Sequence, residues 1–176
     1  ATDDSGVIFA ETVKATTITV LSGESTGENS SAKFAKAVTG NLVMTDGAHA
    51  ASHATVTFNG TAAQTALSGT LTTTKTDADD TFVIIEDSAA GTAAAQTFSG
   101  QIGTSTNKIA SIAVGSANGK AGAAIFSSDV FVNALTITSD DDTTGGAESS
   151  SMTVNGNLTA TTIVLDKDTN DSTLVV

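Results

Sequence analysis

Residues 54–69 read ATVTFNGTAAQTALSG, and this stretch indicates both the secondary structure of the chain and its repetition. Apolar and hydroxyl side chains alternate over residues 55–58, as they do on a β-strand with one face turned to a core. The second half of the stretch returns with small changes at residues 91–100, so that Gln64 and Gln96 lie 32 residues apart. A period of this size is typical of stacked turns of a β-helix with two or three strands per turn.

Similar alternating segments recur along the chain, most of them beginning about 8–15 residues apart, whereas helical periodicity is weak. We therefore expect an all-β fold, most simply a parallel β-solenoid, a repeat array like a β-helix. The alternative is a β-sandwich filament subunit in which a donated terminal strand, from residues 2–19 or 161–176, completes the next subunit's sheet. The clearest expected strands are residues 17–20, 54–58, 81–85, 109–114, 124–126, 130–138, 152–154 and 161–165.

A second, longer repeat is also present. The residues Val13, Ala15 and Thr17-Ile18-Thr19 recur as Val132, Ala134 and Thr136-Ile137-Thr138, at a spacing of 119 residues. This spacing divides the chain into a first long repeat, residues 1–119, and a partial second repeat, residues 120–176, within one continuous β-repeat body. Because the second copy stops in mid-motif, we expect either a fragment of a longer chain or a last strand that a neighbour completes.

The composition narrows the class of protein. The chain has 32 Thr, 19 Ser and 16 Gly but no Pro, Cys, Trp, Tyr or Arg, and its net charge is −12. Such an acidic chain is a poor partner for nucleic acid, because nucleic-acid binding relies on Lys and Arg to neutralise phosphates. No apolar run approaches the ~20 residues that span a membrane, and the absence of Cys excludes disulfides and thiolate sites. We therefore expect no membrane span, and the acidity, which suits surroundings rich in salt or divalent cations, favours an extracellular protein.

Three segments together resemble a pattern of strand, Asn-Gly corner and strand: TVTFNGT at residues 55–61, SGQIGTS at 99–105 and VFVNALTI at 130–137. With these segments the chain resembles the β-strand-repeat surface proteins of bacteria, including S-layer-like proteins and autotransporter-type adhesins. The resemblance implies an extracellular structural protein of the cell surface that self-assembles into a surface layer, fibre or adhesin stalk.

The expected partner is a further copy of the chain, because a stack that ends in unpaired backbone groups must be capped, continued or completed by another subunit. A surface glycan or a lipid anchor stays open as a further partner. Two alternative functions also stay open: a pilus-like filament subunit assembled by strand donation, and an adhesin or binding module for ice or carbohydrate. Thr-x-Thr pairs at residues 17–19, 55–57 and 136–138 are the basis of the ice-binding alternative.

Acidic stretches supply the candidate metal ligands. Asp166-Lys167-Asp168-Thr169-Asn170-Asp171 has a D-x-D-x-N spacing, which places hard oxygen ligands of the kind that calcium prefers on one tight loop. Asp171 stands where the helix-loop calcium motif has Gly, so a solvated turn is the competing interpretation. Calcium is the one cofactor we consider, and the tentative ligands are Asp166, Asp168, Asn170 and Asp171, with Asp140, Asp141, Asp142, Asp77, Asp79 and Asp80 as further loop carboxylates.

Catalytic motifs are lacking in the sequence. No G-x-S-x-G elbow surrounds any Ser, and no phosphate-binding glycine loop precedes a helix. His49 and His53 are four residues apart, without Cys or a nearby Glu to complete a zinc site. We therefore predict that the protein is not an enzyme. The acidic stretches at residues 22–31, 77–80 and 139–151 are expected to be loops that protrude from a regular body.

Overall fold

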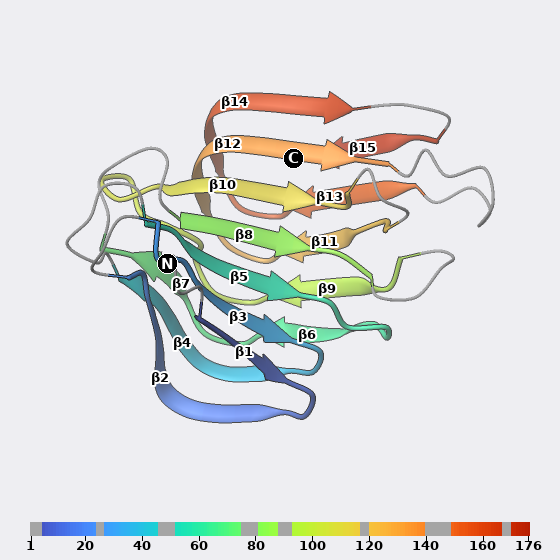
Figure 1. The fold of residues 1–176 in the computed structure, drawn as a ribbon. Helices are drawn as coiled ribbons and strands as arrows, with labels where there is room; N and C mark the ends of the chain where they lie inside the picture. Colours follow the sequence, from blue (N-terminus) through green and yellow to red (C-terminus); the bar gives the residue numbers. More distant parts are fainter. Residues whose placement is uncertain are drawn as a thin grey trace.

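The computed structural model describes residues 5–23, 27–45, 52–74, 81–87, 93–116, 120–139, 149–166 and 170–176. Over these ranges the chain forms fifteen β-strands and no helix, and neighbouring strands pair in parallel (Figure 1). The prediction of a parallel β-solenoid is confirmed. A β-sandwich, the alternative, would need antiparallel pairing between successive strands, so this part of the chain does not form one.

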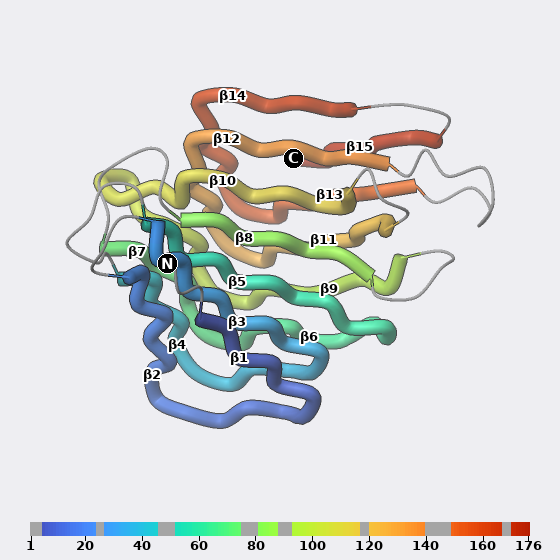
Figure 2. Tube along the Cα trace, viewed as in Figure 1, coloured from blue at the N-terminus to red at the C-terminus, as the bar shows by residue number. Residues whose placement is uncertain are grey.

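The first side of the solenoid is a seven-stranded sheet, to which each turn of the chain adds one strand (Figures 1 and 2). From one end of the stack to the other its strands are β1 (Ser5–Phe9), β3 (Ser30–Phe34), β5 (Ala54–Phe58), β8 (Thr81–Ile85), β10 (Ile109–Val114), β12 (Val130–Thr138) and β14 (Leu158–Asp166).

The second side is an eight-stranded sheet that runs in the same stacking order. The short strand β7 lies off the main path of this sheet and pairs with β4. The strands are β2 (Val13–Leu21), β4 (Val38–Thr45), β6 (Gln64–Leu67), β7 (Leu71–Thr73), β9 (Ala95–Phe98), β11 (Ala123–Phe126), β13 (Ser150–Val154) and β15 (Ser172–Val175).

A narrow third side closes each turn. One column of apolar residues runs along its whole length, and each member pairs with the next one along the stack: Ile18, Leu42, Leu71, Ile102, Val130 and Leu158. The four inner members of this column are buried, and Ile18 and Leu158 at its ends are partly buried. The turn therefore has three corners, and the apolar residues of its three sides meet in one core.

The core of the first side shows how the repeat works. One inward-facing residue from each turn enters a register column that contains Val7, Ala32, Val56, Val83, Ile112, Leu135 and Ile163. Between Ala32 and Leu135 every member of this column is buried, because the neighbouring turns cover it on both sides. The alternating pattern Thr55 to Phe58 has the predicted orientation, with Val56 and Phe58 in the core.

Phenylalanines form a second stack, which crosses the core. Phe9, Phe34 and Phe58 stack on the first side, with ring centroids 5.0 and 5.7 Å apart. Phe58 then meets Phe98 of the second side edge to face at 4.9 Å, and Phe98 stacks on Phe126 at 4.8 Å. Edge-to-face and offset contacts at these distances are favourable aromatic geometries, so the stack ties the two sheets together.

The shorter sequence repeat is confirmed by the register. Gln64 and Gln96 are direct partners on β6 and β9, and the Gln64 amide nitrogen donates to Gln96 Oε1 at 3.0 Å. The buried Gln96 amide nitrogen in turn lies 3.1 Å from the carbonyl oxygens of Gly60 and Ala62 and fixes the corner that precedes β6. At the next corner a Cβ on Gly69 would meet the carbonyl oxygen of Gly40, so the close stacking of turns there requires glycine.

The longer repeat joins strands that are not equivalent in the fold. β2, which contains Val13 to Thr19, belongs to the eight-stranded sheet, whereas the matching strand β12 belongs to the seven-stranded one. The expected loops at residues 22–31 and 139–151 each include, at their C-terminal end, two residues that belong to a strand. Ser30 and Ser31 already pair with β1, and Ser150 and Ser151 already pair with β15, because the register of the neighbouring turn extends the strands into these serines.

Candidate functional site: the two open ends of the solenoid

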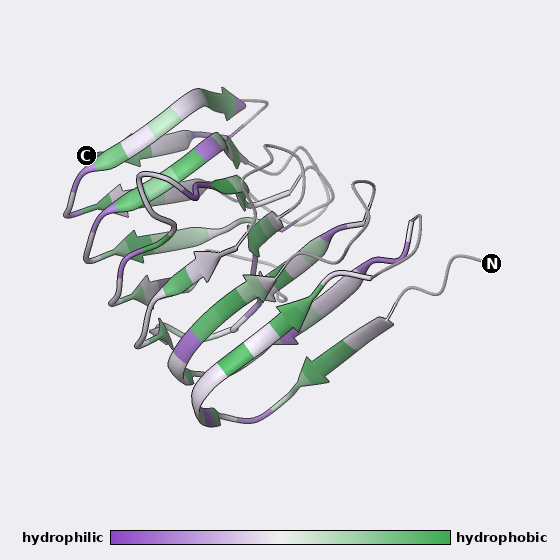
Figure 3. Ribbon diagram, turned by 90° about the vertical axis from the view of Figure 1, so that its left-hand side faces the viewer, coloured by the Kyte–Doolittle hydropathy of each residue, from purple (hydrophilic) through white to green (hydrophobic). Residues whose placement is uncertain are grey.

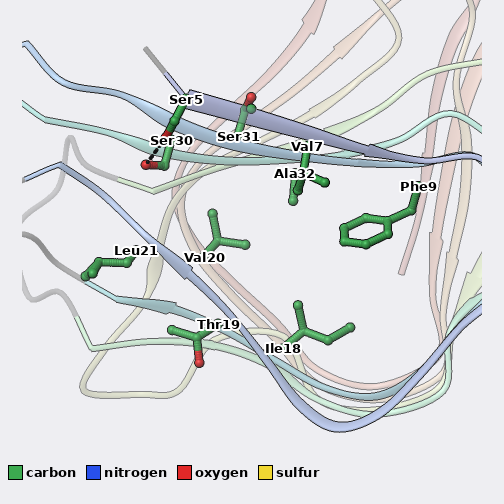
Figure 4. A pocket seen from close by; sticks show the side chains of 11 residues that line it. Ser5, Val7, Phe9, Ile18, Thr19, Val20, Leu21, Ser30, Ser31 and Ala32 are labelled. Carbon is green, nitrogen blue, oxygen red and sulfur yellow. Dashed lines mark hydrogen bonds between the residues drawn. The ribbon is translucent and has the colours of Figure 1, made fainter. Parts of the chain in front are cut away.

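The first turn has an open hollow between its sides, with a volume of about 340 Å³ (Figure 4). Val7 and Phe9 of β1 enter the hollow from one side, and Ile18 and Val20 of β2 enter it from the other. Val7 is 46% exposed although it belongs to the column whose inner members are buried. The hollow therefore lies at the end of the described core, at the place where a further turn would fit.

The opposite end of the stack has the same character. Ile163, Val164 and Leu165 of β14 are between 44% and 49% exposed, and Val175 and Val176 at β15 are also exposed. Figure 3 shows these apolar segments in green on the outermost strands at both ends of the stack. Among the described strands, β1 and β14 each pair on one edge only. Both ends thus combine apolar side chains with an unpaired strand edge.

The predicted calcium ligands are only partly placed. Asp166 ends β14, and Asn170 and Asp171 precede β15, whereas Asp168, Asp140 to Asp142, and Asp77, Asp79 and Asp80 lie outside the described residues. The carbonyl oxygens of Asp166 and Asn170 accept hydrogen bonds from the hydroxyls of Ser172 and Ser139, at 2.6 and 2.7 Å. In the described part of the chain, no group of three or more His, Asp or Glu side chains is placed to hold a metal ion.

Only one of the two histidines is described by the structure, because His49 lies outside the described ranges. His53 packs its ring edge-on against Phe82, with centroids 5.2 Å apart, and its backbone N–H donates to Asn29 Oδ1 at 3.0 Å. These contacts hold His53, directly before β5, against the turns on both sides of it, which is a structural role.

The Thr-x-Thr pairs do not build a continuous hydroxyl array. Thr57 and Thr136 share one outward column of the first side, but Ile84 and Ala113 lie between them in that column. The third pair, at residues 17–19, lies on the other sheet. An ice-binding surface needs hydroxyls in successive turns, so this face offers weak support for that alternative.

An ion-pair cluster that the sequence analysis did not find lies on the surface. Glu86 Oε1, at the end of β8, accepts from Lys33 Nζ at 3.3 Å and from Lys120 Nζ at 3.2 Å. The three residues are 53 and 34 positions apart in sequence, so only the stacking of turns brings them together. The glutamate side chain is 11% exposed and those of the lysines are 32% and 41% exposed. The cluster links separate turns across the outside of the solenoid.

Comparisons with known proteins add no further assignment, since no family model, curated protein or solved structure matches this chain. Among the described residues there is also no helix with the length and apolar character needed to cross a membrane.

Proposed function

We propose that this chain is an extracellular structural protein of the cell surface that self-assembles into a surface layer, a fibre or an adhesin stalk. The observation that carries the proposal is the pair of open ends, where half-exposed apolar side chains lie beside unpaired strand edges. An exposed strand edge next to an apolar surface is a template for pairing with another chain. The extracellular location belongs to the same proposal and rests on the acidic composition, which suits surroundings rich in salt or divalent cations.

The stacked turns between the two ends also support a structural role. Its turns are stacked in register around a continuous apolar core, and extended repeat arrays of this kind act as scaffolds whose length follows from the number of turns. Strand donation, the pilus-like alternative, would require β1 or β15 to leave the strand that it already pairs with, β3 or β13. That alternative therefore has less support than association of complete solenoids.

Electron microscopy of the purified chain, with and without a calcium chelator, tests this proposal. We expect filaments or a regular lattice to form as the protein concentration rises. Dissolution on chelation would assign the assembly to calcium bridging by the acidic loops, which is how calcium enters the proposal. Discrete monomers in both conditions, confirmed by sedimentation, would contradict self-assembly.

A further inference from the structure

We infer that a second copy of this chain adds head to tail, so that β14 of one copy pairs in parallel with β1 of the next and Ile163 lies opposite Val7. The inference rests on the proposed self-assembly and specifies its partner, polarity and register. It follows from three features of the two ends: the direction of their free backbone groups, the order of their side chains, and the agreement between two sides of the solenoid.

The backbone directions at the first end follow from two hydrogen bonds. The Ser5 N–H donates to the Asn29 carbonyl oxygen at 2.9 Å, and the Phe9 carbonyl oxygen accepts from the Ala35 N–H at 3.0 Å. Residues 5 and 9 therefore direct their backbone groups toward the second turn. Successive residues of a strand direct these groups to opposite edges, so Gly6 and Ile8 direct theirs away from the stack.

At the other end of the stack, the backbone groups of β14 alternate in the way that pairing with β1 requires. The Asp166 carbonyl oxygen accepts from the Ser139 N–H at 3.4 Å, so Asp166 faces back into the stack and Ile163 and Leu165 face outward. In a parallel pair, one residue bonds to the two residues that flank its partner. With Ile163 opposite Val7, its N–H meets the Gly6 carbonyl and its carbonyl meets the Ile8 N–H, which are the outward groups of β1.

The same register also stacks the side chains. Val7 and Ile163 are the two ends of one column, and Phe9 and Leu165 are the ends of the column two residues along. Pairing them would cover four apolar side chains that a single copy leaves partly exposed, and would continue the contacts made inside the stack. No charged residue lies in β1 or in residues 161–165 opposite it, so this strand pair desolvates no charge.

The second side agrees with the first. Its column passes through Val13, Val38, Leu67, Phe98, Phe126 and Val154. One step beyond the Thr153–Val175 pair, the register of β13 with β15 sets Val176 in this column. A copy placed with Val7 over Ile163 therefore sets its Val13 over Val176. An unrelated strand would satisfy one edge, whereas a second copy satisfies two sides of the turn at once.

The inference predicts the axial repeat of the assembly. Each copy of the 176-residue chain contributes the seven described strands of the first side, and strands in a sheet are about 4.8 Å apart, so head-to-tail copies would repeat every ~34 Å along the filament. Lateral association of the solenoids would not produce this repeat along their common axis.

Two variants block one end each. Ile8→Pro removes an outward N–H of β1, which no described residue accepts, and proline is tolerated where the missing N–H faces away from the sheet. Ile8→Val keeps the N–H and is its matched control. Ile163→Lys places a charge in the apolar end of β14. Melting curves of the three variants in dilute solution establish that each one folds.

Sedimentation and electron microscopy then measure assembly. We expect filaments with the ~34 Å repeat from the parent chain and from Ile8→Val, and monomers from Ile8→Pro and from Ile163→Lys. An equimolar mixture of the two blocked variants should give dimers and nothing longer, since each variant retains the end that the other lacks.

The outcomes separate this inference from the function that it rests on. Filaments or lattices that persist in both blocked variants would overturn head-to-tail pairing while leaving self-assembly in place. A mixture of folded blocked variants that stays monomeric would also overturn it. A parent chain that remains monomeric at every concentration would overturn both proposals.

Discussion

Ile112 and Ile163 are the same residue type in the same column of the first side, but one is fully buried and the other is 46% exposed. Their strands are both parallel and both rich in apolar residues. The difference is that Ile112 has a turn above and below it, whereas Ile163 has a described turn on one side only. Burial in this fold thus depends on the neighbouring turns rather than on the local sequence, and the ends are where unused packing surface remains.

The largest expected difference in the free energy of unfolding is between alanine substitutions at these two residues. Ile112→Ala leaves a cavity between covered layers, and we expect it to lower the free energy of unfolding by about 2–5 kcal/mol. Ile163→Ala should cost about 1 kcal/mol, because roughly half of that side chain is already in water. Urea denaturation of dilute, unassembled protein measures both values. Equal losses of unfolding free energy at the two positions would contradict the view that the neighbouring turns determine burial.

A middle-sized effect is expected at the corners. Gly69→Ala would push a Cβ into the backbone of Gly40 in the neighbouring turn, and we expect a loss of about 1–3 kcal/mol. Gly6→Ala in the outermost strand is the control, since its nearest neighbour is the rotatable Ser31 hydroxyl. Thermal unfolding should show a lower melting temperature for the first variant and little change for the second. A tolerated Gly69→Ala would mean that the corner can widen.

The smallest effect should come from the surface cluster around Glu86. Glu86→Gln removes the charge that Lys33 and Lys120 share, and we expect a loss below about 1 kcal/mol that shrinks further in high salt. Glu11→Gln, at an exposed residue before β2, is the matched control for the change in net charge. The free energy of unfolding of both variants, measured in low and in high salt, tests this prediction. A salt-independent loss would indicate that the cluster acts by packing instead of by charge.

Much of the fold follows from the sequence because alternation is strong where strands face the core. The expected segments 54–58, 81–85, 109–114 and 130–138 coincide with β5, β8, β10 and β12. The spacing between Gln64 and Gln96 also predicted a real pair of stacked turns. Strands β6, β7 and β9 were not among the clearest segments, and each is only three or four residues long. The eight-residue strand β4 was not among them either, because Thr39, Gly40 and Asn41 interrupt its apolar alternation.

The open ends and the ion-pair cluster were harder to predict from the sequence, for a physical reason. Val7 and Ile163 have the same chemistry as buried members of their column, so only the stacking order reveals that they are outermost. The residues of the Glu86 cluster meet only because of the stacking order, in which Lys33 on β3 reaches past β5 to Glu86, and Lys120 before β11 reaches it from the other side. The spacing of 119 residues reflects similar sequences in two strands, not equivalent positions in the fold. Strands on different sides of the solenoid have similar sequences because both alternate Thr with aliphatic residues.

The register of the first side also determines how this molecule can change in length. Paired residues in the column of Val7 are separated by as few as 23 positions, between Ile112 and Leu135, and by at most 29, between Val83 and Ile112. In strand pairing each turn therefore depends on its two neighbours and on no distant segment. Duplication or loss of one such unit would alter the number of layers while leaving every other pairing as it is. The architecture can thus evolve in length by whole turns, without a redesigned core.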